Sequence, residues 1–382
     1  MDLQKLLDLY RTMLTARQID LAETQLSQRG EAFFHLSGAG HEATAVLAEH
    51  LTEHDWLHCH YRSRALLLAR GVSVRKFFDN TLCKDASTSR GRRMGAFFND
   101  PKLKLLSMVT PVGNNALQAV GIAATVRNRD EKPIVLCGLG DGTTQQGEFL
   151  EACGEASREQ LPVLFLIEDN GLAISTRTEG KTFFADATDG DKFHGIPIRF
   201  VDGHDVVAAS QALGQVVAEM RESRKPAIVI FRVERLFSHT NADDQNIYRT
   251  RAEIASAYEE RDPLAHCRAM LISKGASEPQ LDELEAEVER EVAAAEHAAL
   301  DGVEPQPEHD AKLGIPVELT HPSREFRGSG EPTLTMRDAI RDVLRNQLQI
   351  DSRVCLFGED IEDPKGDVFG IREDSARSSA IA

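Results

Sequence analysis

The residues with the clearest chemical potential are an aspartate between two glycines and an asparagine further along the chain. Gly140, Asp141 and Gly142 follow one short apolar run, and Asn170 follows a second run after a separation of 27 residues. One carboxylate and one amide oxygen suit Mg²⁺, a hard cation that takes few protein ligands and completes its shell with phosphate oxygens. Because glycine lets the backbone approach a ligand closely, the pattern predicts a magnesium and diphosphate site.

The elements around this motif would bring its two halves together. Residues 133–139 and 161–169 are apolar runs typical of buried strands, and residues 147–159 between them carry helix formers. A strand, a helix and a parallel strand make one βαβ unit, so Asp141 and Asn170 should face one crevice, where α/β proteins bind ligands. A Gly-Asp-Gly by itself favours an ordinary turn, and the paired asparagine at this spacing reverses that preference.

Helix and strand alternate along the rest of this region. A helix is predicted from Gly113 to about Val126, and a strand at 198–203, a helix at 205–222 and a strand at 227–233 follow the motif. This alternation predicts an α/β fold, with a mostly parallel sheet and helices on both faces.

The flanking segments are predicted to be helical or irregular. Leucine spacing predicts a long amphipathic helix over residues 2–28 and, after a loop, a second helix that ends near Leu51. Residues 79–111 form a long polar connection, and loops of that length are usually functional. Residues 251–300 are predicted to be helical, and the acidic stretch at their end is interpreted as a solvated helix.

Composition limits the partners of the chain. Its 382 residues are enough for two or more domains, and its net charge of −17 argues against nucleic acid as the main partner, because phosphates would be repelled. No apolar run approaches the roughly 20 residues needed to span a bilayer, so no membrane partner is expected. The N-terminal segment lacks the apolar core of a signal peptide, which favours a cytoplasmic location.

The cysteines are expected to be buried thiols. Six occur, at widely separated positions: Cys59, Cys83, Cys137, Cys153, Cys267 and Cys355. They show neither CxxC pairing nor metal-like spacing, and several lie in apolar surroundings. The cluster of His54, His58 and His60 raises the alternative of a zinc site, which is less favoured because surface and core histidines are commoner than ligands.

Composition changes near the C-terminus. Residues 303–332 are punctuated by prolines and glycines and keep no helical or strand period, which is typical of a linker. An amphipathic helix and a buried strand are predicted within residues 333–382. Because so short a segment cannot bury a core of its own, we interpret it as the start of a second domain that follows a first domain at residues 1–302.

Over roughly residues 5–325 the chain resembles the alpha subunit of the thiamine diphosphate-dependent 2-oxoacid dehydrogenases, the decarboxylating first component of their complexes. Four segments carry the resemblance: the Tyr-Arg segment 60–73, the arginine-rich stretch 89–94, the turn 110–123 and the loop 238–254. Residues 333–370 resemble the first helix and strand of the beta subunit. The chain therefore looks like an alpha subunit with the start of a fused beta subunit, and a thiamine diphosphate-binding fold is implied.

The resemblance implies roles for individual residues. Asp141 and Asn170 would bind Mg²⁺, with the main-chain carbonyl of Leu172 as a third ligand. Tyr61 and Arg62 would hold the diphosphate of thiamine diphosphate, for which the planar fork of arginine is suited.

The same resemblance implies contacts with the rest of the cofactor. Thr110 belongs to the turn that supports it, and Val112 would be the apolar wedge that bends it. Gly142 and Thr143 would offer backbone N–H groups near a helix start, a natural phosphate site. His239, the expected catalytic residue, would lie in a loop over the thiazolium and the substrate.

Other positions are expected at the margin of the site or depart from the family pattern. His35 and Ser37 are expected to line the entrance. Asp169 stands where many relatives carry asparagine. Glu168 stands where some branched-chain relatives carry arginine, which questions a diphosphate contact at that position.

The activity implied by the resemblance is oxidative decarboxylation of a 2-oxoacid, with transfer of the acyl group to a lipoyl group on an acyltransferase component. The family's glutamate that hydrogen-bonds the aminopyrimidine belongs to the beta subunit, and Glu359 does not match it. The chain is therefore expected to work with a beta subunit in a heterotetramer and to be inactive alone. The stretches 89–94 and 238–254 favour branched-chain substrates. Pyruvate or acetoin dehydrogenases, a truncated non-catalytic paralogue and a transketolase-like enzyme are the alternatives.

Overall fold

The apolar runs of the chain form the strands of one sheet. The computed structural model describes residues 1–306 and 334–354, and the chain divides into two units, Met1–Glu304 and Pro305–Ala382. The strands of the sheet, all in the first unit, are β1 (Trp56–His58), β2 (Val135–Gly140), β3 (Val163–Asp169), β6 (Lys192–Phe193), β7 (Ile196–Asp202) and β8 (Ala227–Arg232).

The sheet is mostly parallel, as predicted. Its order is β1-β2-β3-β8-β7-β6, and β6 at the edge pairs antiparallel with β7 while the other pairs are parallel. Gly140 at the end of β2 lies opposite Glu168 near the end of β3. Asp141 and Asn170 directly follow these strands and therefore lie at the carboxyl ends of two neighbouring parallel strands. This arrangement confirms the predicted βαβ unit.

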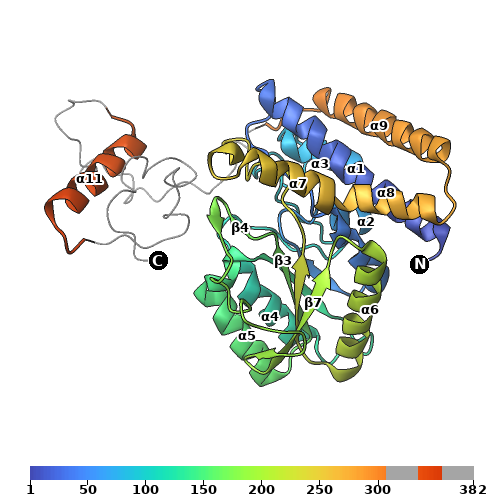
Figure 1. The fold of residues 1–382 in the computed structure, drawn as a ribbon, viewed down its shortest axis with the longest axis horizontal. Coiled ribbons are helices and arrows are strands. Elements are labelled where there is room, and N and C mark those ends of the chain that lie inside the picture. The colour runs from blue at the N-terminus through green and yellow to red at the C-terminus, as the bar shows by residue number, and fades with distance from the viewer. Residues whose placement is uncertain (307–333, 355–382) are drawn as a thin grey trace. The chain divides into compact units, whose positions relative to one another are not determined.

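Helices cover both faces of this sheet. Those of the first unit are α1 (Leu3–Gln28), α2 (Arg64–Ala69), α3 (Val74–Thr81), α4 (Asn114–Val126), α5 (Gly147–Glu159), α6 (Val206–Ser223), α7 (Arg251–Arg261), α8 (Pro263–Ser273) and α9 (Glu278–Leu300). Figure 1 shows α4 and α5 together on one side of the strands and α6 on the other. The predicted helices at 2–28, 113–126, 147–159 and 205–222 are confirmed.

Strand residues alternate between two hydrophobic clusters, because successive side chains of a strand point to opposite faces. Cys137 and Phe165 pack in the cluster under α4 and α5. Leu136 and Leu164 belong to the larger cluster, which also includes residues of α1, α6 and α9. All four side chains are fully buried, so truncating one such as Phe165 to alanine should cost about 3–5 kcal/mol of stability.

The acidic helix α9 packs against α1, and the two lie side by side in Figure 1. Leu281 and Val288 of α9 are fully buried. Arg11 of α1 lies 2.9 Å from Glu287 and 3.1 Å from Glu291. The acidic face is solvated, as predicted, because Glu287 and Glu291 stay about half exposed, whereas the apolar face is buried against α1.

Two segments differ in detail from expectation. The helix predicted to end near Leu51 is a 3₁₀ helix, η1 (Glu42–His50). It packs against α1, α2 and α6, and its tighter turns suit this confined position. The connection after α3 is irregular, as predicted, but it is not uniformly polar. Phe97 and Phe98 are buried, and Phe98 lies 4.6 Å from Phe77 between ring centres, so this connection is anchored to the core.

The cysteines agree with the prediction of free thiols within the described residues. Cys59, Cys137, Cys153 and Cys267 are buried, and Cys83 is half-buried. Burial raises the pKa of the Cys267 thiol to about 12, which keeps it protonated and unreactive.

The described part of the second unit contains the helix α11 (Met336–Ile350), as predicted. The hydroxyl of Thr335 caps it by accepting a hydrogen bond from the N–H of Asp338. The strand expected after this helix, and most of the linker expected at 303–332, lie outside the described residues. Over the described ranges, every helix is too short or too polar to cross a membrane.

Candidate cation and phosphate site

Asp141 begins the candidate site at the carboxyl end of β2. Its side chain is 2% exposed, and its Oδ2 accepts a hydrogen bond of 2.5 Å from the hydroxyl of Thr178. Burial, opposed by Thr178 and reinforced by the charge of Asp169, raises the pKa of Asp141 to about 6. A buried carboxylate beside a second carboxylate favours a bound cation, which would replace the missing positive charge.

Asn170, after the neighbouring strand β3, provides an amide oxygen at the same edge. Its Oδ1 accepts a hydrogen bond of 3.1 Å from the N–H of Leu172, and its Nδ2 lies 3.1 Å from Nε2 of His41. Carboxylate, amide and main-chain oxygens are the ligands that Mg²⁺ prefers, so the oxygens expected from Asp141, Asn170 and the carbonyl of Leu172 are of the type that fits this ion.

Two glycines allow close approaches around these donors. A Cβ on Gly142 would lie 2.6 Å from the Cβ of Ala173, which directly follows Leu172. Gly113 has a φ of 84°, and a Cβ there would lie 2.9 Å from the Cβ of Gln146. Any side chain at either position would push apart the segments that carry the predicted cofactor contacts.

Tyr61, Arg62 and His239 lie together, although 177 positions separate the last two. The guanidinium of Arg62 lies 5.1 Å from the ring centre of Tyr61, and its Nη2 lies 2.8 Å from Nδ1 of His239. Arg62 is 2% exposed and also donates to the carbonyl of Ser37. A buried guanidinium with its fork toward a polar loop suits an anion such as a phosphate.

A pocket beside this cluster brings Tyr61 together with two other predicted positions. Tyr61, Val112 and Thr143 line it with His60, although they come from three separate segments. Thr110 is exposed and does not line this pocket.

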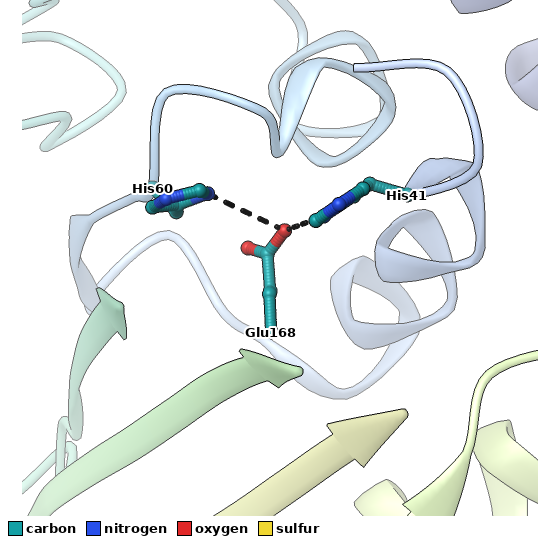
Figure 2. Close-up of side chains that lie close together, drawn as sticks. All are labelled: His41, His60 and Glu168. Carbon is teal, nitrogen blue, oxygen red and sulfur yellow. Dashed lines mark hydrogen bonds and ion pairs between the residues drawn. The ribbon is translucent and has the colours of Figure 1, made fainter. Parts of the chain in front are cut away.

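Glu168 and His41 are the residues that sequence reasoning underrated. Glu168 is fully buried and lies between His41 and His60, as Figure 2 shows. Its Oε2 is 2.6 Å from Nδ1 of His41 and 3.7 Å from Nδ1 of His60, and its Oε1 accepts a hydrogen bond from Ser63. An acid within an otherwise apolar strand, close to Asn170, was the signal available in the sequence.

These contacts determine the charges of the pair. Burial opposes ionisation of Glu168, but the hydrogen bonds of His41 and His60 outweigh it and hold the pKa of the carboxyl well below its usual range. Burial lowers the pKa of His41 to about 4, against the opposite effect of Glu168. Near neutral pH, Glu168 is therefore a carboxylate and His41 a neutral imidazole.

Other histidines differ from expectation. His35 does not line an entrance, because it is buried and its Nδ1 lies 3.2 Å from Glu23 of α1. Ser37, expected beside it, donates to Asp20 of the same helix. Among the described residues, the groups that are close enough to share a metal are His41–His60–Glu168 and Asp20–Glu23–His35, which excludes the zinc trio of His54, His58 and His60.

The loop that carries His239 is held by a hydrogen-bonded chain. Asp243 accepts bonds from the N–H of His239, at 2.7 Å, and from the hydroxyl of Tyr248, at 2.5 Å. Arg235 donates to the same hydroxyl, at 2.6 Å. Asp244 caps the short helix η3 (Gln245–Ile247), so Asp244 is structural while Asp243 positions the backbone of His239.

The fold and the site define a class of α/β proteins in which oxygen donors and a buried arginine lie near the carboxyl ends of the parallel strands. Residues 10–308 match the family model described as dehydrogenase E1 component. The 2-oxoisovalerate dehydrogenase subunit alpha of Bacillus subtilis is 31% identical over 303 residues, which cover 77% of this chain and 92% of that protein.

Other relatives, among them a pyruvate-type protein, share a comparable sequence identity with this chain. The pyruvate dehydrogenase E1 component subunit alpha of Mycoplasma pneumoniae is 32% identical over 67% of this chain and 69% of its own length. The 3-methyl-2-oxobutanoate dehydrogenase subunit alpha of Mycobacterium tuberculosis is 29% identical over 72% of each chain. The chain belongs to the dehydrogenase E1 component family, and it is an alpha-type member of the 2-oxoacid dehydrogenases.

Proposed function

We propose that this chain binds thiamine diphosphate and Mg²⁺ and, with a beta-type subunit, catalyses oxidative decarboxylation of a branched-chain 2-oxoacid. The observation that carries the proposal is the pair of oxygen donors, Asp141 and Asn170, at the ends of two adjacent parallel strands. The raised pKa of Asp141 supports it, because a buried acid that resists ionisation gains most from a divalent cation.

The residues of this chain would act mainly by binding and orientation. Asp141, Asn170 and the carbonyl of Leu172 would hold Mg²⁺ between them and the diphosphate, while Tyr61 and Arg62 would contact the phosphate oxygens. When bound, thiamine diphosphate supplies the electron sink that decarboxylation of a 2-oxoacid requires.

The remaining contacts would shape the site around the reacting carbon. Val112 would support the bend of the cofactor, and Thr110, Gly142 and Thr143 would add polar contacts. His239, whose Nδ1 lies 2.8 Å from Nη2 of Arg62, would reach the substrate from the loop above. Because a guanidinium only donates hydrogen bonds, Nδ1 of His239 accepts this bond and carries no proton in this contact.

A beta-type part is expected to complete the site, because in the family the glutamate that hydrogen-bonds the aminopyrimidine belongs to the beta subunit. We infer a heterotetramer of alpha and beta parts, inactive when the beta part is missing, and acyl transfer to a lipoyl group of a partner acyltransferase. Residues 333–382 would begin a beta-like domain after a linker at 303–332, and a cytoplasmic location suits such an assembly.

Substrate class is the finer part of the proposal. The names of two relatives, from Bacillus subtilis and Mycobacterium tuberculosis, favour branched-chain 2-oxoacids. The similar identity to the pyruvate-type subunit of Mycoplasma pneumoniae makes pyruvate the second candidate.

Calorimetry and turnover would test the proposal together. Thiamine diphosphate is titrated with Mg²⁺ into the chain, with and without a beta-type subunit, and each mixture is assayed with 3-methyl-2-oxobutanoate and pyruvate. Mg²⁺-dependent binding, with turnover only in the mixture and a higher kcat/KM for 3-methyl-2-oxobutanoate, is expected. Asp141→Asn should abolish binding, whereas Asp130→Asn, at an exposed position, is the matched control. Absence of binding in both mixtures would leave a non-catalytic paralogue.

A further inference from the structure

A buried chain of hydrogen bonds leads from the diphosphate-binding segment to the candidate metal ligand Asn170. The hydroxyl of Ser63, directly after Arg62, donates to Oε1 of Glu168, and Oε2 of Glu168 lies 2.6 Å from Nδ1 of His41. The other ring nitrogen of His41, Nε2, lies 3.1 Å from Nδ2 of Asn170. Glu168 and His41 are fully buried, so solvent does not compete for these contacts.

The carboxylate selects the tautomer of His41. A carboxylate oxygen only accepts hydrogen bonds, so Nδ1 of His41 must carry the proton to satisfy the contact of 2.6 Å with Glu168. Oδ1 of Asn170 accepts from the N–H of Leu172, so the amide presents its donor Nδ2 to Nε2 of His41, which accepts.

The tautomer in turn selects the orientation of the Asn170 amide. An acceptor at Nε2 requires the donor Nδ2 of Asn170 beside it, which leaves Oδ1 on the opposite side. There Oδ1 accepts from the N–H of Leu172 at 3.1 Å and keeps a lone pair for a cation. In the flipped orientation, two acceptors would face each other at His41 and two donors would meet at Leu172.

We propose that His41 and Glu168 are positioning residues, which hold the amide of Asn170 with its oxygen toward Mg²⁺. This inference rests on the proposed function, because it assigns these two residues a role in the same metal site. Neither residue touches the metal, and both act through Asn170. Glu168 also accepts a hydrogen bond from Ser63, the residue after Arg62. One buried carboxylate therefore contacts both the segment proposed to bind phosphate and the histidine that orients the proposed metal ligand.

Two substitutions at His41 separate positioning from packing. Glutamine has an NH₂ group that donates and a carbonyl oxygen that accepts, so His41→Gln can donate to Glu168 and accept from Asn170. Leucine has a similar bulk and neither function, so His41→Leu frees the amide to rotate. Removing a group that orients a metal ligand typically weakens metal binding by about 10- to 100-fold.

Metal affinity gives a readout that is independent of turnover. Mn²⁺, which takes similar oxygen ligands, is titrated into the full chain with a beta-type subunit and saturating thiamine diphosphate, and free Mn²⁺ is counted by electron paramagnetic resonance. We expect His41→Leu to weaken Mn²⁺ binding at least about tenfold, and His41→Gln to stay within about threefold of the wild type. Urea unfolding of each variant reports whether it is folded.

A second substitution tests the orientation itself. Asn170→Asp has two equivalent oxygens, so its carboxylate offers an oxygen to the metal in either orientation. In that background, His41→Leu should change Mn²⁺ affinity by less than about threefold, and the difference between the two backgrounds measures the coupling between His41 and the amide.

The outcomes separate this inference from the proposed function. If the wild type binds no Mn²⁺ or thiamine diphosphate, the proposed function fails. If the wild type binds both but His41→Leu binds Mn²⁺ equally well, the positioning role is wrong while the function stands. Equal losses in His41→Gln and His41→Leu, or equal losses from His41→Leu in the wild-type and Asn170→Asp backgrounds, would also overturn it, since packing alone would then explain the loss.

Discussion

Two buried aspartates at opposite ends of the same sheet differ in what surrounds them. Asp55 precedes β1 at the amino end, is fully buried, and receives hydrogen bonds from Arg221, at 2.9 and 2.5 Å, and from the N–H groups of Ile134 and Thr52, at 2.8 and 2.7 Å. Burial alone would raise the pKa of Asp55, but these donors outweigh burial and hold it below its usual value.

Asp141, at the carboxyl end, has the opposite balance. It is buried to nearly the same degree, and this burial together with the charge of Asp169 raises its pKa, because the hydroxyl of Thr178 does not offset them. The protein itself neutralises Asp55, which is therefore structural. Asp141 meets no cationic side chain among its described contacts, which agrees with the proposal that it binds a cation from outside.

The largest expected effect is the loss of the structural carboxylate. Asp55→Asn removes the charged partner of Arg221, whose side chain is 21% exposed, and the free energy of unfolding should fall by about 3 kcal/mol, the lower end of the range for a buried ion pair. Urea unfolding of the metal-free chain measures it. Asp141→Asn, the matched control, should not lower stability under these conditions; an equal loss there would remove the distinction between the two sites.

For ligand binding, the ranking of the two variants should be reversed, with Asp141→Asn affected more than Asp55→Asn. Asp141→Asn removes the ligand proposed to bind Mg²⁺ directly, so Mg²⁺-dependent binding of thiamine diphosphate should weaken by more than about 100-fold, beyond the range typical of groups that only orient ligands. Calorimetry gives the dissociation constant. Asp55→Asn, measured at a temperature where it is folded, should bind as the wild type does, and a similar loss in both variants would contradict the contrast.

Stability should respond to pH with opposite signs at the two positions. Because the folded pKa of Asp141 is raised to about 6, its cost to the metal-free chain is complete above pH 6 and disappears as pH falls toward about 4, the unfolded value. Wild type should therefore gain about 2 kcal/mol relative to Asp141→Asn between pH 7 and pH 4.

Asp55 follows the opposite rule, since its folded pKa is depressed. Its contribution is complete above about pH 4 and is lost as pH falls below that value. Unfolding free energies of wild type, Asp55→Asn and Asp141→Asn from pH 7 to pH 3 would test both signs. If the unfolding free energies of both variants, each taken relative to the wild type, change with pH in the same direction, the two environments do not differ in charge.

The smallest expected effect belongs to the neighbour of the metal ligand. Asp169→Asn removes a charge that attracts the cation, and Mg²⁺ affinity should fall by about threefold at low salt, less at high salt. The pKa of Asp141 should fall at the same time, because a like charge is removed. Calorimetry at two ionic strengths checks the first effect, and a salt-independent loss would argue against an electrostatic role.

The sequence by itself determined the sheet and the position of its site. Apolar runs at 133–139 and 161–169 with a helix between them dictate a parallel βαβ unit, because the geometry of that unit leaves few alternatives. Asp141 and Asn170 followed those strands in the sequence, so their meeting at one edge could be predicted. That Arg62 and His239, far apart in the chain, belong to one site was expected only through the family resemblance, and their direct contact was not predicted.

Tertiary structure alone decided the charges and contacts of the buried groups. Nothing local in the sequence shows that Glu168 faces His41, that Asp55 meets Arg221 while Asp141 meets no such donor among its described contacts, or that the acids of α9 meet Arg11. Strand and helix periods are local properties that a sequence states directly. The protonation state of a buried group depends on which distant side chains the fold brings within a few ångströms, and only the folded chain determines that.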